Sequence, residues 1–421
     1  MMTMTTPYEY VPRHLSNRLD EFLAQFPVVL LQGARQVGKS TLLKNHLSAW
    51  QHLDLEQASV TALVARDPEL YLRDHPERVW FDEVQRVPEL FPALRVAIDR
   101  DRRPGRYVIS GSANPILLKR VSESLAGRTG ILDLSPYSAA EAARRNPPSF
   151  LQHFLAAHDA RDLFERMNAA SRADEAEFRR HWLIGGYPEV HQLTDATQRQ
   201  RWFEAYTRLI SERDLRELAA GLHPTAFHRL LRMLAARHGQ ALNLSALANE
   251  MGIATNTLKS YLDLLEGAFL WRRLPPYHRN LGKRLVKTPK AYLADSGLLH
   301  ALLAQTRLEE VEVSPLHGAS WEGWIITQLE AQTRLLDTPL QLYYWRTNAG
   351  AEVDLVLENG TRLFAIEIKA TSQIQSADLR GLKQFLEDYS DATRFGVIVY
   401  RGEHVARVHE QIVAVPVGMA V

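Results

Sequence analysis

One short stretch, LLQGARQVGKST at residues 30–41, constrains the fold more than any other part of the sequence. The aliphatic run that precedes its first glycine predicts a buried strand. Leucines at helical spacing follow the lysine and predict a helix. A strand, the loop pattern G-x-x-x-x-G-K-[ST] and a helix together predict a phosphate-binding loop, because backbone N–H groups and the positive end of the helix surround the phosphate oxygens.

This loop predicts a site for ATP with Mg²⁺. We expect Lys39 to reach the β- and γ-phosphates, and Ser40, or Thr41 beside it, to offer its hydroxyl to Mg²⁺. The alternative is a glycine-rich turn with an incidental lysine. The expected nucleotide-binding residues are Gly33, Ala34, Arg35, Gln36, Val37, Gly38, Lys39, Ser40 and Thr41.

Two further strands predict the rest of this site. The stretch RVWFDEVQRVPEL ends a hydrophobic strand on Asp82 and Glu83. We expect Asp82 to hold the Mg²⁺ and Glu83 to polarise the attacking water. In RYVISGSAN, Ser110 is the first candidate to touch the γ-phosphate or the water, with the later Ser112 and Asn114 as alternatives.

Arg128 follows the end of an expected helix in LAGRTGILDL. It suits a finger that one subunit inserts at the γ-phosphate of its neighbour. The alternative is a solvated arginine at a helix C-terminus. The finger interpretation predicts self-assembly into a ring-shaped homo-oligomer, such as a hexamer.

Composition excludes several classes of site and partner. The 421 residues include no cysteine, which excludes disulfides, cysteine-based zinc sites and thiol nucleophiles, and a cytoplasmic location fits this best. The formal net charge is +1, so a nucleic acid would have to be held by a local basic patch. No apolar run is long enough to predict a membrane span.

From residue 226 the spacing of leucines predicts a helix-turn-helix. We expect one helix to be capped by Ser245 and to end at Gly252, and the next to begin at Thr255 or Thr257. Two strands should follow, as in a winged-helix domain. The second helix would present Lys259 and its polar neighbours Thr255, Asn256 and Ser260 outward, toward DNA phosphates or base edges.

The expected wing is rich in cations and contains no acid. Trp271 and Tyr277 interleave these cations and could stack on bases, so the segment predicts a DNA contact. A protein-packing winged helix with a solvated basic hairpin is the alternative. The cations are Arg272, Arg273, Arg279, Lys283, Arg284, Lys287 and Lys290.

Alternating residues on both sides of Asn359-Gly360 predict a β-hairpin. A two-residue loop at Asn-Gly would give paired positions that sum to 719, with Asp354 and Glu367 as diagonal neighbours. Glu352, Asp354, Glu367 and Lys369 would then share one face, and Val353, Leu355, Phe364, Ile366 and Ile368 the other. The acids could grip one Mg²⁺, or they could form cross-strand ion pairs on a solvent-facing sheet.

The order of these motifs resembles a bacterial and archaeal AAA-type P-loop ATPase fused to a C-terminal domain of unknown function. The matching stretches include LLQGARQVGKSTLL, WFDEVQRVPEL, ISGSAN, LAGRTGILDLSPYS, IGGYPEV, ERDL and VKTPKAYLADSGLLHALL. The resemblance implies a helical lid over the nucleotide, with Arg208 and Arg213 as candidates for a second sensor.

The hairpin resembles the core of the PD-(D/E)xK nucleases. Asp354 and the triplet of Glu367, Ile368 and Lys369 stand in the matching places, and Glu322 would be the acid of the upstream helix. The resemblance implies a metal site that activates water, with Lys369 as an electrostatic helper. Val353 replaces the proline expected beside the first acid, which puts cleavage in doubt.

The sequence therefore predicts an α/β protein: a P-loop AAA-type ATPase domain over 1–146, a helical lid over 147–225, a winged-helix domain over 226–309 and a nuclease-like α/β domain over 310–421. We expect it to hydrolyse ATP and to act on DNA. The alternative function is an ATP-dependent regulatory switch with protein partners and catalytically silent C-terminal domains.

Overall fold

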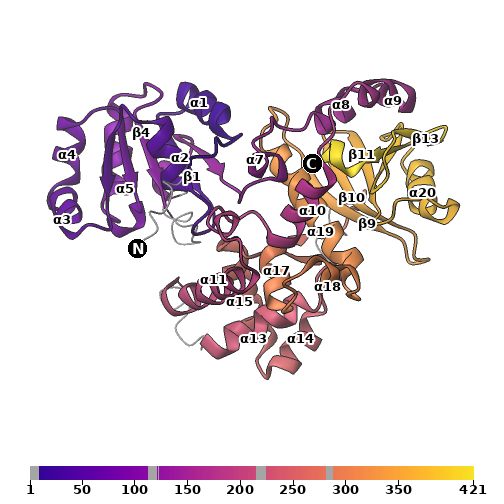
Figure 1. The fold of residues 1–421 in the computed structure, drawn as a ribbon. Helices are drawn as coiled ribbons and strands as arrows, with labels where there is room; N and C mark the ends of the chain where they lie inside the picture. The colour runs from indigo at the N-terminus through magenta and orange to yellow at the C-terminus, as the bar shows by residue number, and fades with distance from the viewer. Residues whose placement is uncertain (1–8, 112–120, 122, 215–223, 281–287) are drawn as a thin grey trace, which may run out of the picture. The chain divides into compact units, whose positions relative to one another are not determined.

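The computed structural model describes residues 9–111, 121, 123–214, 224–280 and 288–421 (Figure 1). The chain divides into two compact units, one formed by 1–137 with 141–146 and the other by 138–140 with 147–421. Ser112, Asn114, Lys283, Arg284 and Lys287 lie outside the described residues. The predictions made for these five residues therefore stay predictions.

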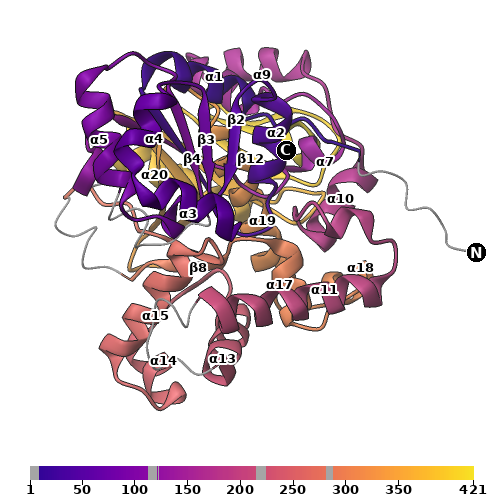
Figure 2. The same ribbon diagram turned by 90° about the vertical axis from the view of Figure 1, so that its left-hand side faces the viewer.

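The first unit is built around a parallel sheet with the strand order β2-β3-β4-β1-β5 (Figure 2). Its strands are β1 (Val28–Gln32), β2 (Gln51–Asp54), β3 (Val79–Asp82), β4 (Tyr107–Ser110) and β5 (Thr129–Asp133). Its described helices are α1 (Ser16–Gln25), α2 (Lys39–His46), α3 (Ala58–Arg66), α4 (Pro68–Asp74), η1 (Val84–Arg86) and α5 (Leu90–Arg100), and α7 (Ala139–Ala142) spans the passage between the units.

The sheet order brings three strand ends together. All residues of β1, β3 and β4 are buried, and each strand is an apolar run that ends in one polar residue. Strand β4 lies between β1 and β3, and Leu31 pairs with Ser110. Because carboxyl ends of parallel strands meet at one edge, Ser110 and Asp82 lie beside the loop that leaves β1.

Helices α8 (Phe150–Ala156), α9 (Ala160–Asn168) and α10 (Glu175–Ile184) open the second unit. Their apolar residues share one core with the C-terminal sheet, and the Phe154 ring lies 5.3 Å from that of Phe364. The expectation of a separate lid made from these helices therefore differs from their packing. The segments that follow are η2 (Val190–Gln192), α11 (Ala196–Leu209) and η3 (Ile210–Asp214).

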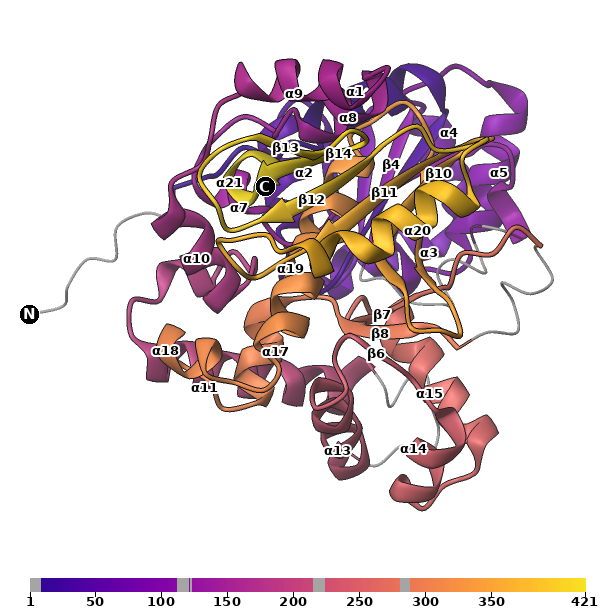
Figure 3. The same cartoon turned by 90° about the vertical axis from the view of Figure 1, so that its right-hand side faces the viewer.

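Three helices and a three-stranded sheet, in the order β6-β8-β7, come next (Figure 3). The elements are α13 (Pro224–Ala235), β6 (Gln240–Ala241), α14 (Leu244–Met251), α15 (Thr255–Gly267), β7 (Trp271–Leu274) and β8 (Lys290–Leu293). Asn243, rather than Ser245, caps α14 by accepting the N–H of Ala246. Ser245 is the second residue of the helix, so it does not occupy the N-cap position. Gly252 ends α14 in the left-handed conformation, as expected.

The C-terminal part is a six-stranded mixed sheet with the order β13-β14-β12-β11-β10-β9 (Figure 3). Apolar clusters cover both of its faces, one containing residues of α19 and the other residues of α20. The sheet is therefore not solvent-facing. The elements are α17 (Ser296–Leu302), α18 (Leu308–Glu312), α19 (His317–Thr333), β9 (Gln341–Arg346), β10 (Glu352–Asn359), β11 (Arg362–Ile368), η4 (Ser376–Leu379), α20 (Arg380–Asp388), β12 (Gly396–Tyr400), β13 (Ala406–His409), β14 (Ile412–Pro416) and α21 (Val417–Ala420).

The predicted hairpin exists, but the predicted register differs from the observed one by one pair. Asn359 pairs with Arg362, so the loop is Gly360-Thr361 and paired positions sum to 721. Gly360 has a φ of 59°, which suits a turn with glycine first. Continued along the strands, this register puts Asp354 directly opposite Glu367 rather than diagonal to it.

A register shift between Val353 and Val356 also alters the predicted faces. Val353 and Val356 belong to the cluster with α20, whereas Leu355 belongs to the cluster with α19. Strict alternation would have put Val353 and Leu355 on one face. The shift breaks the period of two at the position of Asp354.

Candidate functional site

The loop between β1 and α2 has the backbone that its two glycines allow. A side chain at Gly33 would place Cβ 2.3 Å from the carbonyl oxygen of Leu134, at a φ of 155°, so only glycine fits there. Gly38 adopts the left-handed conformation, with a φ of 94°, directly before α2 begins at Lys39. The N-terminus of α2 therefore opens onto the loop, as a phosphate-binding loop requires.

Lys39 is buried inside this loop. Its Nζ donates to the carbonyl oxygens of Gly33, at 2.9 Å, and Ala34, at 2.8 Å. The ammonium group thus lies within the curve of the backbone, and it must turn away from these carbonyls to meet a phosphate. Of the remaining expected nucleotide-binding residues, Val37 is buried, Arg35, Ser40 and Thr41 are half-buried, and Gln36 is exposed.

Four side chains from three elements, α2, β3 and β4, form one chain of hydrogen bonds at the ends of β3 and β4. Ser40 Oγ donates to Asp82 Oδ2 at 2.7 Å, and Ser110 Oγ donates to Asp82 Oδ1 at 2.6 Å. Trp80 Nε1 in turn donates to Ser110 Oγ at 2.6 Å. The structure thus brings three predicted site residues together. A hydroxyl and a carboxylate are ligand types that Mg²⁺ accepts, so the residues present fit this ion.

Glu83 follows Asp82 with a φ of 53°, an unusual backbone for glutamate. Its carboxylate accepts a hydrogen bond from the Gln85 side chain. The backbone N–H of Glu83 donates to Asp82 Oδ1 at 3.1 Å. The two adjacent acids therefore have different partners. Asp82 accepts hydrogen bonds from Ser40 and Ser110, whereas Glu83 accepts one from Gln85.

Two residues near this site were not predicted from the sequence. Arg13 is buried, donates to the carbonyl oxygen of Val37 at 2.8 Å, and forms an ion pair with Glu141 at 3.1 Å. His52 stacks on the Trp80 ring at 3.8 Å, and its Nε2 lies 3.9 Å from Asp82 Oδ2. Burial lowers the pKa of His52. Neither residue belongs to a local motif, so only the tertiary structure reveals them.

Arg128 points to an acid of its own subunit. Its guanidinium forms an ion pair with Asp99 at 2.6 Å, on the helix α5. This hydrogen bond lowers the pKa of Asp99. The predicted finger role requires Arg128 to leave Asp99, and it remains a prediction.

The four residues of the predicted nuclease-like site lie close together, and two of them, Glu322 and Asp354, face a fifth residue that was assigned elsewhere. Lys290, predicted as a wing cation, is buried with its Nζ 2.9 Å from Glu322 Oε1 and 3.9 Å from Asp354 Oδ1. Lys369 Nζ donates to Glu367 Oε1 at 2.8 Å. The cluster is therefore an ion-pair network.

Burial strongly affects the acids of this cluster. Desolvation, with the nearby carboxylate of Asp354, raises the pKa of Glu322 to about 7. Burial likewise raises the pKa of Asp354, and it raises that of Glu367 well above the usual range. Desolvation opposes the charge on Lys290, but its acidic neighbours, Glu322 foremost, raise its pKa overall.

The residues present do not fit a divalent metal. Among the described residues, no group of three histidine, aspartate or glutamate side chains is arranged to hold a metal ion. The predicted metal ligands Glu322, Asp354 and Glu367 are instead near one another with an ammonium group among them. The sequence prediction missed this because Lys290 was assigned to the solvent-exposed wing.

The other described wing cations also have acidic partners. Arg272 is half-buried and pairs with Glu330, and Arg279 pairs with Asp391. The wing segment itself contains no acid, as the sequence shows, but acids outside the segment pair with these described cations. Arg273 completes the set by pairing with Asp263 and Glu266.

The predicted aromatic contacts of the wing are also wrong. The Trp271 ring is buried and its Nε1 donates to the carbonyl oxygen of Leu262 at 2.6 Å. Tyr277 packs in the cluster with α20, with its ring 5.3 Å from that of Tyr389. Neither ring is available to stack on a base. On α15, by contrast, Asn256, Lys259 and Ser260 are exposed as predicted.

Comparisons with known proteins place this chain in a family. An uncharacterized protein of Mycobacterium tuberculosis is 36% identical over 406 residues, which cover 96% of this chain and 83% of that protein. An uncharacterized protein of Mycobacterium bovis matches with the same values. The chain belongs to the family of these mycobacterial proteins.

Three family models match separate parts of the chain. Residues 25–143 match the AAA domain, residues 175–309 a domain of unknown function (DUF8612), and residues 317–419 a second one (DUF4143). The first unit therefore contains an AAA-type P-loop domain. Among solved structures, a Walker-type ATPase of Pyrococcus abyssi is 18% identical with a TM-score of 0.43, over 68% of this chain and 94% of that one.

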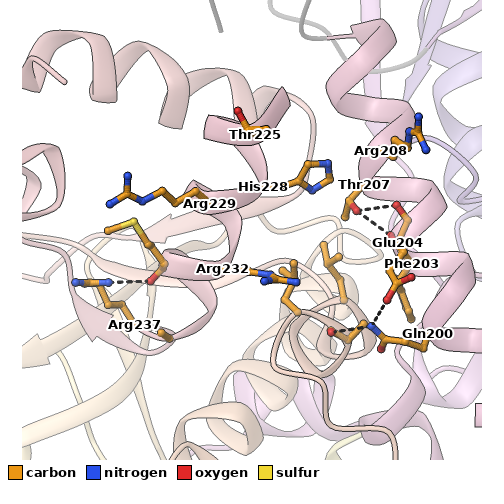
Figure 4. Close-up of a pocket in the computed structure, with 15 residues that line it drawn as sticks. Gln200, Phe203, Glu204, Thr207, Arg208, Thr225, His228, Arg229, Arg232 and Arg237 are labelled. Atoms are coloured by element: carbon orange, nitrogen blue, oxygen red, sulfur yellow. Dashed lines mark hydrogen bonds between the residues drawn. The ribbon is translucent and has the colours of Figure 1, made fainter. Parts of the chain in front are cut away.

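A cavity of about 700 Å³ lies within the second unit (Figure 4). It is lined by α11, α13 and α17, and Figure 4 shows His228 and Arg232 from α13 together with Thr207 from α11. Arg208, a sensor candidate, also lines it and pairs with Glu212 at 2.8 Å. The side chain of Arg213, the other candidate, is not described.

Over the described parts of the chain, every helix is too short or too polar to cross a bilayer.

Proposed function

We propose that this protein binds Mg²⁺-ATP at its AAA domain and hydrolyses it to ADP and phosphate. The observation that carries this proposal is the pair of hydrogen bonds from Ser40 and Ser110 to the two oxygens of Asp82. This arrangement lies directly beside the loop that ends in Lys39. It gathers the residues for phosphate, metal and water chemistry at one edge of the sheet.

Each residue has a role that follows from its chemistry. The loop backbone and Lys39 would hold the phosphates, and Ser40 with Asp82 would hold the Mg²⁺. Bound Mg²⁺ would neutralise charge on the β- and γ-phosphates. Glu83 would accept the proton of the attacking water, whose oxygen bonds to the γ-phosphorus as the bond to the β-γ bridging oxygen breaks.

Phosphate release tests this proposal. Wild type should release phosphate with Mg²⁺ and ATP and stop when EDTA is added. Asp82→Asn should lose most turnover, because the metal loses a charged ligand, while Asp54→Asn should retain it. Asp54 is the matched control, since it ends the neighbouring strand β2 but does not bond to Ser40. Equal turnover in both variants would contradict the assignment.

We infer that the second unit contains a winged-helix and a nuclease-like domain. The order α13, β6, α14, α15, β7, β8 with one small sheet supports the first, because a helix-turn-helix is followed by two paired strands. A helix, an antiparallel β9-β10-β11 meander, the helix α20 and the parallel strand β12 support the second.

We propose DNA as the partner that couples to ATP turnover, now through α15 rather than through the wing arginines. Lys259 is exposed on this helix beside polar Asn256 and Ser260, a set that can meet phosphates and base edges. Self-assembly into a ring would supply Arg128 to a neighbouring nucleotide.

One observation favours the alternative, an ATP-dependent switch with protein partners and silent C-terminal domains. The described wing cations are already paired with acids. The acids of the nuclease-like cluster are likewise paired with lysines of the same chain. Paired charges release fewer counterions from DNA, so they contribute little to binding it.

ATPase assays with single-stranded, duplex and junction DNA separate the two functions. The DNA hypothesis predicts stimulated turnover, and weaker DNA binding for Lys259→Glu than for Arg161→Glu. Arg161 is the matched control because it is also an exposed cation on a helix. If no DNA stimulates turnover and both variants bind DNA like wild type, the switch hypothesis is correct. A mass measurement with and without nucleotide tests the ring.

A further inference from the structure

Lys290 occupies an unusual position for a lysine. It is the first residue of β8, and its side chain is only 7% exposed. Its Nζ lies 2.9 Å from Glu322 Oε1 on α19 and 2.5 Å from Glu352 Oε1 on β10. Asp354 Oδ1 is 3.9 Å away. One ammonium group therefore faces three carboxylates from two other elements.

These acids also accept hydrogen bonds from other donors of the chain, Asp354 at its second oxygen and Glu322 at the same Oε1 that faces Lys290. Asp354 Oδ2 accepts the backbone N–H of Ile368 at 2.8 Å. Tyr292, two residues after Lys290 on the same strand, donates its hydroxyl to Glu322 Oε1. Strand alternation explains why both reach the same acid, because residues two apart point to one side. The acids are thus held by donors of this chain.

These contacts suit an ammonium ion and not a divalent metal. Charge-assisted N–H···O bonds have lengths of about 2.7–2.9 Å, close to those at Glu322. Mg²⁺ requires oxygens at about 2.0–2.1 Å in octahedral geometry. A metal placed between Glu322 and Asp354 would also face the positive charge of Lys290 at close range, which opposes its binding.

We propose that Lys290 is the resident cation of this cluster, taking the place that a divalent metal would hold in a cutting nuclease. The proposal rests on the nuclease-like fold inferred above. In consequence the cluster binds no metal and cuts no DNA in the wild-type chain. Lys290 instead ties the sheet of β6, β7 and β8 to α19 and β10.

The proposal also predicts how the site can be opened. Removing the charge of Lys290 leaves several buried carboxylates without their main counter-ion, and this favours a replacement cation. Lys290→Gln removes the charge but keeps an N–H donor for Glu322 and Glu352. The variant should therefore acquire a metal site that the wild type lacks.

Titration of the full chain with Mn²⁺ alone, followed by the electron paramagnetic resonance signal of free Mn²⁺, tests this. Wild type and Asp354→Asn should give the same titration, because the cluster binds no Mn²⁺ in either. Lys290→Gln should gain one Mn²⁺ site. Its apparent affinity for Mn²⁺ should be at least ~10-fold tighter than any residual Mn²⁺ binding by wild type, in line with favourable carboxylate ligation. Lys290→Gln with Asp354→Asn should lose that site, and Arg161→Gln should resemble wild type.

Two results would overturn the proposal. One is Mn²⁺ binding by wild type that Asp354→Asn abolishes, and the other is folded Lys290→Gln that gains no site. If Lys290→Gln does not fold, wild type against Asp354→Asn decides alone. Calorimetry with Mg²⁺-ATP on the same samples reports on the P-loop separately, so failure of the ATPase proposal and failure of this one are distinguishable.

Discussion

Ser40 Oγ lies 2.7 Å from Asp82 Oδ2, although the two residues are 42 positions apart in the sequence. The first is in the opening turn of α2 and the second ends β3. Their bond joins the phosphate-binding loop to the acid expected to hold the metal. It is the geometric basis for assigning ATP hydrolysis to the AAA domain.

Glu83→Gln should separate binding from hydrolysis. The amide cannot accept the proton of the attacking water, so turnover should fall by roughly 10²–10⁴-fold while Mg²⁺-ATP still binds and is retained. Glu89→Gln, which changes an exposed acid of the same segment, should behave like wild type. Nucleotide retention after gel filtration and phosphate release are the measurements. Unchanged turnover in Glu83→Gln would place the base elsewhere.

Ser110→Ala should weaken the metal site and the fold together. The change removes the donor to Asp82 Oδ1 and the acceptor of Trp80 Nε1, which is then buried without a partner. The free energy of unfolding should fall by about 1–3 kcal/mol, the typical cost of an unsatisfied buried polar group.

Trp80→Phe serves as the control for Ser110→Ala, since it removes the indole donor but leaves the bond from Ser110 to Asp82. Turnover should be lower in Ser110→Ala than in Trp80→Phe. Denaturant unfolding and steady-state kinetics measure the two effects. Equal kinetics in the two variants would show that Ser110 has no role beyond packing.

Arg128→Ala should lower hydrolysis by at least roughly 10²-fold without loosening Mg²⁺-ATP affinity, if the arginine acts on a neighbour's nucleotide. Asp99→Ala removes its partner within the subunit and should leave or increase turnover. Turnover per subunit should rise with protein concentration as the ring assembles. An active enzyme that sedimentation shows to be strictly monomeric would remove this role.

Local motifs explain why the AAA site could be predicted. Lys39 and Ser40 sit in one continuous pattern, and Asp82 ends an apolar strand that the sequence marks clearly. The parallel sheet then brings those strand ends together with no further information. Arg13 and His52 could not be found this way, because their contacts depend on tertiary packing.

The C-terminal predictions failed where pairing partners are distant. The wing is rich in cations within its own segment, but Glu330 and Asp391 neutralise Arg272 and Arg279 from elements far along the chain. The hairpin loop moved by one residue because Gly360, not Asn359, takes the first central position of the turn. The sum of paired positions stays odd after this change, so Asp354 and Glu367 still lie on the same face of the hairpin.

A turn and a helix cap are joined at Asp295. Its carboxylate accepts the N–H groups of Gly186, at 2.8 Å, and Leu298, at 2.9 Å, and a Cβ at Gly185 would lie 2.2 Å from it. This explains why residue 185 is a glycine. Burial raises the pKa of Asp295 to about 6.

Stability should therefore depend on pH through Asp295. The folded state binds this proton more tightly than the unfolded state, so the stabilisation is complete below about pH 4 and is lost as pH rises through about 6, by up to about 3 kcal/mol. Asp295→Asn should reduce this slope, whereas Asp195→Asn, which changes the exposed cap of α11, should keep it. Denaturant unfolding from pH 4 to 7 measures it. Identical slopes in wild type and Asp295→Asn would contradict the assignment.

Isothermal titration calorimetry with Mg²⁺-ATP tests the central claim most directly. Wild type should show saturable binding with one nucleotide per chain, and Lys39→Ala should show none while retaining the wild-type circular dichroism spectrum. Folded wild-type protein that shows neither heat nor saturation would contradict the account, as would a Lys39→Ala variant that binds the nucleotide with wild-type affinity.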